Sequence, residues 1–134
     1  MPKFAASCAY GTLFGIAAAL VFAAPAISDA SSETITAATH AELAAGAGDL
    51  DGVHTHLHHV LNCLVGPGGN GFDAKALNPC AQGGHGAIPD TTDATKKSSL
   101  EAAADKARAG LASNNVKEAR ADASGAASLL KPGK

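Results

Sequence analysis

The sequence predicts an all-α protein: an antiparallel four-helix bundle made of two helical hairpins joined by a long, disulfide-linked loop. Alanine-rich segments with apolar residues at helical spacing occupy residues 32–65 and 96–131. A short polar turn divides each segment, and a glycine- and proline-rich stretch at residues 66–95 separates the two. We therefore expect four helices that pack as two antiparallel pairs.

Residues 1–30 have the features of a cleavable secretory signal peptide. Lys3 precedes an apolar run, LFGIAAALVFAAPA, that is too short to span a bilayer comfortably. Small residues favour cleavage after Ala26 or after Ala30, and we expect the second because polar, helix-forming sequence follows it. An uncleaved membrane anchor is the alternative. The mature chain, residues 31–134, is then one domain that is periplasmic or secreted and has no membrane span.

The first hairpin is expected to begin at Ser31 and Ser32, which can cap a helix. A polar break at residues 46–49 ends that helix, and Asp49 or Asp51 is expected to cap the next. Four apolar residues mark the inner face of this second helix: Val53, Leu57, Val60 and Leu64.

The loop at residues 66–95 is longer than most connections in compact domains, so we expect it to be tied down. After processing, the chain keeps two cysteines, Cys63 and Cys80, and an even number in an oxidising compartment indicates a disulfide. Two free thiols are the alternative. We expect Phe72 and Leu77 to pack against the bundle and to provide the recognition surface of the loop.

The second hairpin repeats the alanine-rich pattern, with a break at residues 113–115. Its expected inner faces contain Leu100, Ala104, Ala107 and Leu111 in one helix, and Val116, Ala119, Ala123, Ala126 and Leu130 in the other. Each alanine contact buries little apolar area, so we expect modest stability. Alanine-lined surfaces of this kind also permit a homo-oligomer.

The histidines are confined to one part of the chain. All six lie in the first hairpin or the loop, and the second hairpin has none. His54 and His58 are one helical turn apart, and a turn centred near Asp49 places His40 at the height of His58. We therefore predict a site at His40, His54 and His58 for a divalent transition metal such as Cu²⁺, Ni²⁺ or Zn²⁺.

Three further histidines are less favoured ligands: His56, His59 and His85. Glu42 pairs in height with His56 and gives a weaker second possibility. The alternatives to metal binding are histidines that are only solvated, or a pH-sensitive face.

Several other functions are disfavoured. Phe72 is the one aromatic residue of the mature chain and there is no basic patch, which argues against nucleic acid. The glycines at residues 66–71 follow a helix and lack the Gly-Lys-Ser ending of a nucleotide-binding loop. Haem is disfavoured because no CxxCH motif is present. We expect no enzyme, because a disulfide would remove Cys63 as a nucleophile beside His59.

The segment Thr39-His40-Ala41-Glu42, together with His54-x-x-x-His58, resembles small periplasmic histidine-rich metal-binding proteins that form four-helix bundles. The resemblance implies metal buffering or trafficking in the cell envelope. This sequence differs in its few histidines, all outside the second hairpin, and in its disulfide loop. For this chain, the resemblance therefore implies one or two metal sites. The alternative is a non-catalytic structural or interaction module that binds an envelope protein through the Cys63–Cys80 loop.

Overall fold

Five helices account for most of residues 29–131, the part of the chain that this computed structural model describes. They are α1 (Ala30–Gly46), α2 (Leu50–Val65), α3 (Ala87–Asp90), α4 (Ala94–Ala112) and α5 (Val116–Leu130). No strand occurs among these residues, so the predicted all-α class is confirmed. Within the same range, no helix combines the length and the apolar character needed to cross a membrane.

Each long helix begins at a side chain that accepts a hydrogen bond from a backbone N–H of its first turn. These N-caps are Asp29, Asp49, Asp93 and Asn115. Such a cap satisfies one of the N–H groups that the first helical turn leaves without a partner. The prediction of Asp49 is confirmed, whereas that of Ser31 and Ser32 is wrong because Asp29 precedes them and accepts from Ser32.

Asp29 also bears on where a signal peptide could be removed. Its side chain caps α1, and its backbone N–H donates to the carbonyl of Gly83 in the loop at 2.9 Å. Cleavage after Ala30 would remove this residue, whereas cleavage after Ala26 would retain it. The predicted signal sequence otherwise lies outside the described residues.

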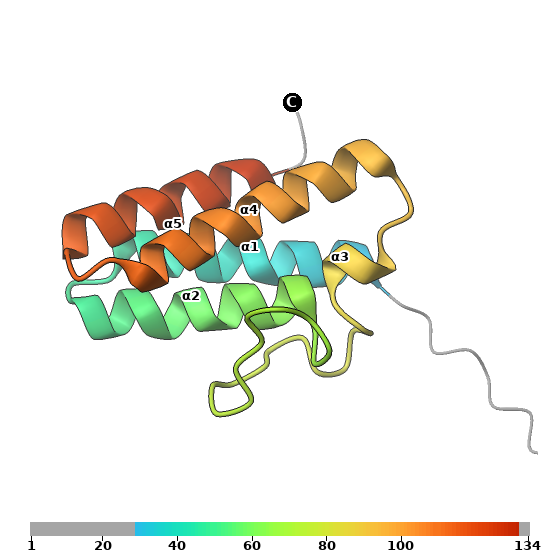
Figure 1. Cartoon of the computed structure of the whole chain (residues 1–134), viewed down its shortest axis with the longest axis horizontal. Coiled ribbons are helices and arrows are strands. Elements are labelled where there is room, and N and C mark those ends of the chain that lie inside the picture. Colours follow the sequence, from blue (N-terminus) through green and yellow to red (C-terminus); the bar gives the residue numbers. More distant parts are fainter. Residues whose placement is uncertain (1–28, 132–134) are drawn as a thin grey trace, which may run out of the picture.

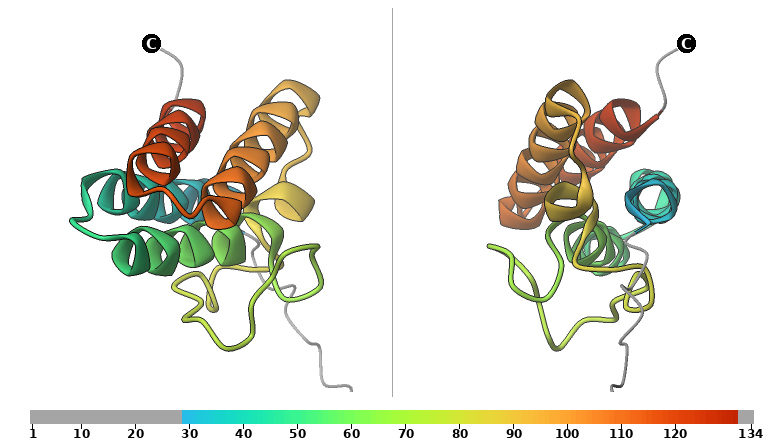
Figure 2. Two further views of the ribbon diagram at one scale, coloured as in Figure 1. Left: turned by 60° about the vertical axis from the view of Figure 1, so that its left-hand side comes forward. Right: turned by 90° about the vertical axis from the view of Figure 1, so that its right-hand side faces the viewer.

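The four long helices form two hairpins that pack against each other. Helix α1 contacts α2 and α5, and α4 contacts α2 and α5. Figure 1 shows α1 beside α2, α4 beside α5, and the loop below α2. In the left view of Figure 2, the pair α4 and α5 crosses the pair α1 and α2 at an angle. An antiparallel bundle with all four helices aligned stays a prediction.

The core contains mainly alanines from α1, α4 and α5, together with Leu100 and Leu130, and larger side chains from α2. Ala37, Ala41 and Ala44 of α1 are fully buried. The residues of α2 that the sequence placed on its inner face are also fully buried: Val53, Leu57, Val60 and Leu64. A Cβ on Gly110 of α4 would lie 2.6 Å from a methyl carbon of Leu57 and 3.2 Å from the Ala119 carbonyl oxygen. The absence of a side chain at Gly110 therefore leaves room for Leu57 of the other hairpin.

The loop between α2 and α4 is tied to the helices at several points. Cys63 of α2 and Cys80 form the predicted disulfide, with 5.1 Å between their Cα atoms. The loop also contains the one-turn helix α3, which the sequence did not predict. Gly66 and Gly86 cross so closely that a Cβ on Gly66 would lie 1.6 Å from the carbonyl oxygen of His85. Both glycines have positive φ, 66° and 114°.

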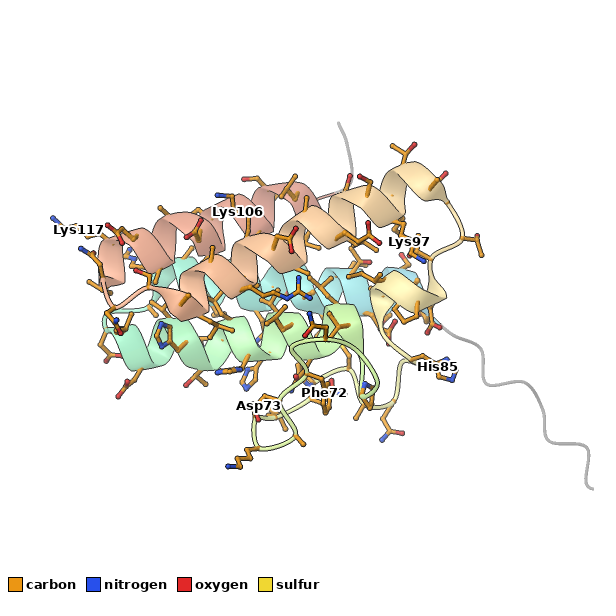
Figure 3. All side chains as sticks on the ribbon, viewed as in Figure 1. Phe72, Asp73, His85, Lys97, Lys106 and Lys117 are labelled. Atoms are coloured by element: carbon orange, nitrogen blue, oxygen red, sulfur yellow. A yellow bond between two sulfur atoms is a disulfide. The ribbon has the colours of Figure 1, made fainter. Side chains whose placement is uncertain are left out.

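Phe72 and Leu77 differ in their surroundings. Phe72 is partly buried and packs against the core, as predicted, and Figure 3 shows it on the loop below α2. Leu77 was also expected to pack against the helices, but it is 66% exposed. The reason is that Asn62, a buried amide of α2, holds the loop by its backbone. Asn62 accepts from the N–H of Asp73 and donates to the carbonyls of Asp73 and Leu77.

Candidate metal centre

Three histidines come together where α1 lies against α2. His40 belongs to α1, and His56 and His59 belong to α2. Residues three apart on a helix are separated by about 60° around its surface, so His56 and His59 occupy the same side of α2. The short turn between Gly46 and Leu50 brings His40 to their height. We call His40, His56 and His59 the histidine triad.

The ring nitrogens of the triad are close to one another. His40 Nδ1 lies 3.2 Å from His56 Nδ1 and 3.3 Å from His59 Nδ1. One nitrogen from each ring lies within 4.8 Å of the other two. The rings of His40 and His59 meet nearly edge to face, with centroids 4.8 Å apart. All three side chains therefore direct a potential ligand atom toward the same small volume.

These separations suit a tetrahedral metal ion. A tetrahedral Zn²⁺ with Zn–N bonds of about 2.0–2.1 Å places its ligand nitrogens about 3.3 Å apart. The two Nδ1 separations that involve His40 have this length. Imidazole is a good ligand for Zn²⁺, Cu²⁺ and Ni²⁺. The three histidines thus lie close enough to hold a metal of this class.

The surroundings of His40 and His59 favour their neutral rings. Burial lowers the pKa of His40 below its usual 6.5, and the neighbouring His59 and His56 lower it further. Burial is also the main reason that the pKa of His59 is lowered, with smaller effects from His56 and His58. His59 is only 8% exposed. Because metals bind the neutral imidazole, both shifts favour the ligating form of His40 and His59 near neutral pH.

His54 and His58, the predicted partners of His40, lie on the other side of α2. The Nε2–H of His54 donates to the carbonyl oxygens of Gly110 and Ser113 at the end of α4, at 3.2 and 3.1 Å. Nε2 must carry a proton to make these bonds, so it has no lone pair for a metal. His54 therefore adds a second donor to the carbonyl of Gly110, which already accepts from the N–H of Ser113, and supplies one to the carbonyl of Ser113 beyond the end of α4.

His58 and His85 lie near carboxylates of the loop. His58 Nδ1 is 3.5 Å from a carboxylate oxygen of Asp73, and His85 Nδ1 is 3.2 Å from one of Asp90. Figure 3 shows His85 at the outer edge of the loop, pointing away from the helices. Neither histidine joins the triad.

The structure places His40 at the expected height beside α2, but next to His56 and His59 and not next to His54. The sequence places His54 and His58 on one side of the inner face of α2, and His56 and His59 on the other. Which of these sides meets α1 depends on the direction in which the hairpin turns and on where α4 packs. That information is absent from the spacing of residues within α2. The weaker possibility was that Glu42 lies opposite His56. In the structure, His40 lies next to His56, with 3.2 Å between their Nδ1 atoms.

Glu33 is a buried carboxyl group that the sequence did not single out. It is 2% exposed, and its Oε1 accepts from the N–H of Gly86 at 3.2 Å. Burial raises its pKa, and the nearby Asp90 raises it further. A Cβ on Gly83 would lie 2.7 Å from Glu33 Cγ, so Gly83 leaves space for this side chain. An acidic residue in a first helical turn is normally solvated, so the sequence carries no signal of this burial.

Two grooves lie beside the loop. One of about 910 Å³ separates the loop from α4 and is lined by His85, Ile88, Lys97 and Arg108 among others, but by no residue of the triad. A second, of about 610 Å³, is lined by His54, His58, His59, Asp73 and Leu77 among others. His59 therefore connects the triad to this second groove.

Comparisons of the chain with protein-family models, with curated proteins and with solved structures found no match.

Proposed function

We propose that this protein is an exported helical bundle that binds one divalent transition metal through His40, His56 and His59. The observation that carries the proposal is the convergence of three ring nitrogens, one from each histidine, within 4.8 Å. This set replaces His40, His54 and His58, the one proposed from the sequence. Binding of a single ion per chain is more consistent with trafficking or local buffering than with high-capacity storage.

Export is a part of the proposal that the disulfide supports. Disulfides persist in oxidising compartments such as the periplasm and are rare in the cytosol. The Cys63–Cys80 bridge would be stable there. We propose cleavage after Ala26, because this retains the Asp29 cap of α1. The intact mass of the exported protein tests the site, since a mature chain that starts at Ser31 would contradict it.

The proposed function involves no catalysis by the chain. Cys63 could act as a nucleophile beside His59 only as a thiol, and the disulfide with Cys80 removes that thiol. The role proposed for the histidines is to hold the metal.

Calorimetric titration of the exported protein with Cu²⁺, Ni²⁺ and Zn²⁺ tests the metal site. We expect one ion per chain, and a loss of affinity of at least roughly tenfold when His40 or His59 is replaced by alanine. His85→Ala is the matched control, because His85 is exposed on the loop and lies outside the triad. Equal affinity in all variants, or equal loss in the control, would overturn the proposed site.

A second candidate function rests on the exposure of Leu77. An apolar side chain that is 66% exposed on a disulfide-linked loop is suited to contact another protein of the envelope. Leu77→Ser should then abolish recovery of that partner from envelope extract. Leu129→Ser on α5 is the control, since Leu129 is an exposed leucine far along the chain from the loop. Unchanged recovery with Leu77→Ser would exclude this role.

A further inference from the structure

The histidine triad supplies three ligands, and tetrahedral ions take four. Among residues 29–131, the cluster that could hold a metal contains His40, His56 and His59 and no cysteine or carboxylate as a fourth member. Metal sites that serve a structural role usually have four protein ligands, whereas sites with three protein ligands leave one position for water or another molecule. The number of ligands therefore indicates an incomplete coordination shell.

The charge of the triad also leaves a bound ion uncompensated. Three neutral imidazoles contribute no negative charge, so a divalent ion would keep its full charge of +2. Holding that charge at a partly buried position is costly unless an opposite charge accompanies it. An anion in the fourth position would lower this cost. Thiolate or carboxylate ligands would have lowered it from within the protein, and the triad contains neither.

The triad is accessible from the protein surface. His40 and His56 are both partly exposed, although His59 is almost completely buried. His40 precedes the fully buried Ala41 on α1, and its Nδ1 lies 3.2 and 3.3 Å from the Nδ1 atoms of His56 and His59 of α2, so it lies at the edge where α1 meets α2. The triad is therefore only partly covered by the protein, and its residue His59 also lines the groove of about 610 Å³ beside the loop.

We propose that the metal-loaded triad binds one small anion in its fourth coordination position. This inference rests on the proposed metal site and adds the class of its external ligand: a small monoanion that offers a single donor atom. Carboxylates as small as formate belong to this class, as do halides and azide. The protein would then carry its metal as an anion complex.

Azide binding to the Co²⁺-loaded protein tests the inference. Co²⁺ adopts the tetrahedral geometry of Zn²⁺ and has visible absorption bands that respond to its ligands. We expect azide to shift these bands in a saturable manner, with one azide per Co²⁺, and formate to reverse the shift by competition. The protein is used as exported, with its disulfide intact.

Two results would overturn the inference while leaving the metal site in place. Co²⁺ could bind while its bands ignore a large excess of azide, which would mean that the coordination shell is already closed. Alternatively, Co²⁺ could convert the protein to a dimer that does not respond to azide, with the fourth ligand coming from a second copy. Failure of the metal site itself is distinct, because Co²⁺ would then bind no more tightly than to the His40→Ala variant.

Discussion

The hairpin of α1 and α2 and the hairpin of α4 and α5 are built from the same kinds of parts. Both have Asp or Asn caps at the start of each helix, and both bury alanines along their contact. They differ at the edge of that contact. The first hairpin has three imidazoles there, whereas the second has an ion pair between Lys106 and Asp122, with 3.0 Å between the charged atoms.

The two hairpins share the packing of the core, but only the first carries the candidate metal site. The second hairpin contributes to the core and supplies the carbonyls of Gly110 and Ser113 that engage His54. The first contributes to the core and also presents the triad and the disulfide loop. Four changes, taken in order of expected effect, test how far the two hairpins differ.

Removal of the disulfide should have the largest effect on stability. Cys63 and Cys80 close a loop with a sequence separation of 17, and a loop of this size stabilises a fold by about 3 kcal/mol in the chain-entropy model. Replacement of both cysteines by serine should lower the melting midpoint by about 10 °C or more. Thermal unfolding followed by circular dichroism measures this. A reducing agent should reproduce the loss in the natural protein and leave the double variant unchanged.

Gly110→Ala should destabilise the contact between the hairpins. The added Cβ would lie 2.6 Å from Leu57, which is fully buried and has little room to move. Overpacking of this kind costs about 1–3 kcal/mol. Gly46→Ala is the matched control, because a Cβ there has nothing within 4 Å. Urea unfolding of both variants measures the difference. Equal stability would mean that the hairpins are not closely packed at Gly110.

His54→Ala should separate stability from metal binding. Loss of its hydrogen bonds to Gly110 and Ser113 should cost about 1 kcal/mol and leave metal affinity unchanged. His56→Ala should instead lower the metal affinity and leave the stability nearly unchanged, because the ring of His56 contacts His40 within the triad. Urea unfolding and metal titration of the two variants provide the comparison. Loss of metal affinity in His54→Ala would restore the ligand set first predicted from the sequence.

The smallest expected effect is a pH dependence of stability that arises in the first hairpin. The pKa values of His40 and His59 are lowered in the folded protein, chiefly by burial. Below pH 6.5, the ordinary pKa of histidine, the unfolded chain therefore binds more protons than the folded chain. The contribution of these two histidines to the free energy of unfolding is fully present above pH 6.5. It is lost as the pH falls from 6.5 through the lowered pKa values of the folded protein.

Urea unfolding of the metal-free protein at pH values between about 7.5 and about 5 measures this loss. This range extends about one unit or more to either side of the ordinary histidine pKa. Replacement of both His40 and His59 by glutamine should flatten the dependence. Lys106→Gln in the second hairpin is the control and should leave the slope unchanged, because it removes an ion pair with Asp122 and leaves every histidine in place. An unchanged slope in the double variant would contradict the assignment.

Local patterns in the sequence predicted most of the fold. Periodic apolar residues and polar breaks identified four helices within a few residues of their observed ends, and an even number of cysteines identified the disulfide. Helix α3 could not be predicted, because a single helical turn is too short to show a periodic pattern of apolar residues. Asp29 escaped notice as a cap because it stands within the sequence expected to be removed with the signal peptide.

The candidate site was predicted in part. His40 lies at the height of histidines of α2, as expected across a hairpin, because that height follows from the rise per residue of a helix. The choice between the two sides of α2 depended on contacts with α4, more than fifty residues away along the chain. His54 illustrates this, because its role is set by the carbonyls of Gly110 and Ser113. Spacing within one helix carries no information about such partners.

The crossing of Gly66 and Gly86 has a consequence for how this protein can change over evolutionary time. Each glycine occupies space that a side chain on the other would need, and each has a backbone conformation that other residues rarely adopt. A substitution at either position would damage the loop even if the other position remained glycine. We therefore expect these two positions to resist drift together, while their exposed neighbours, such as Pro67 and Gly68, vary.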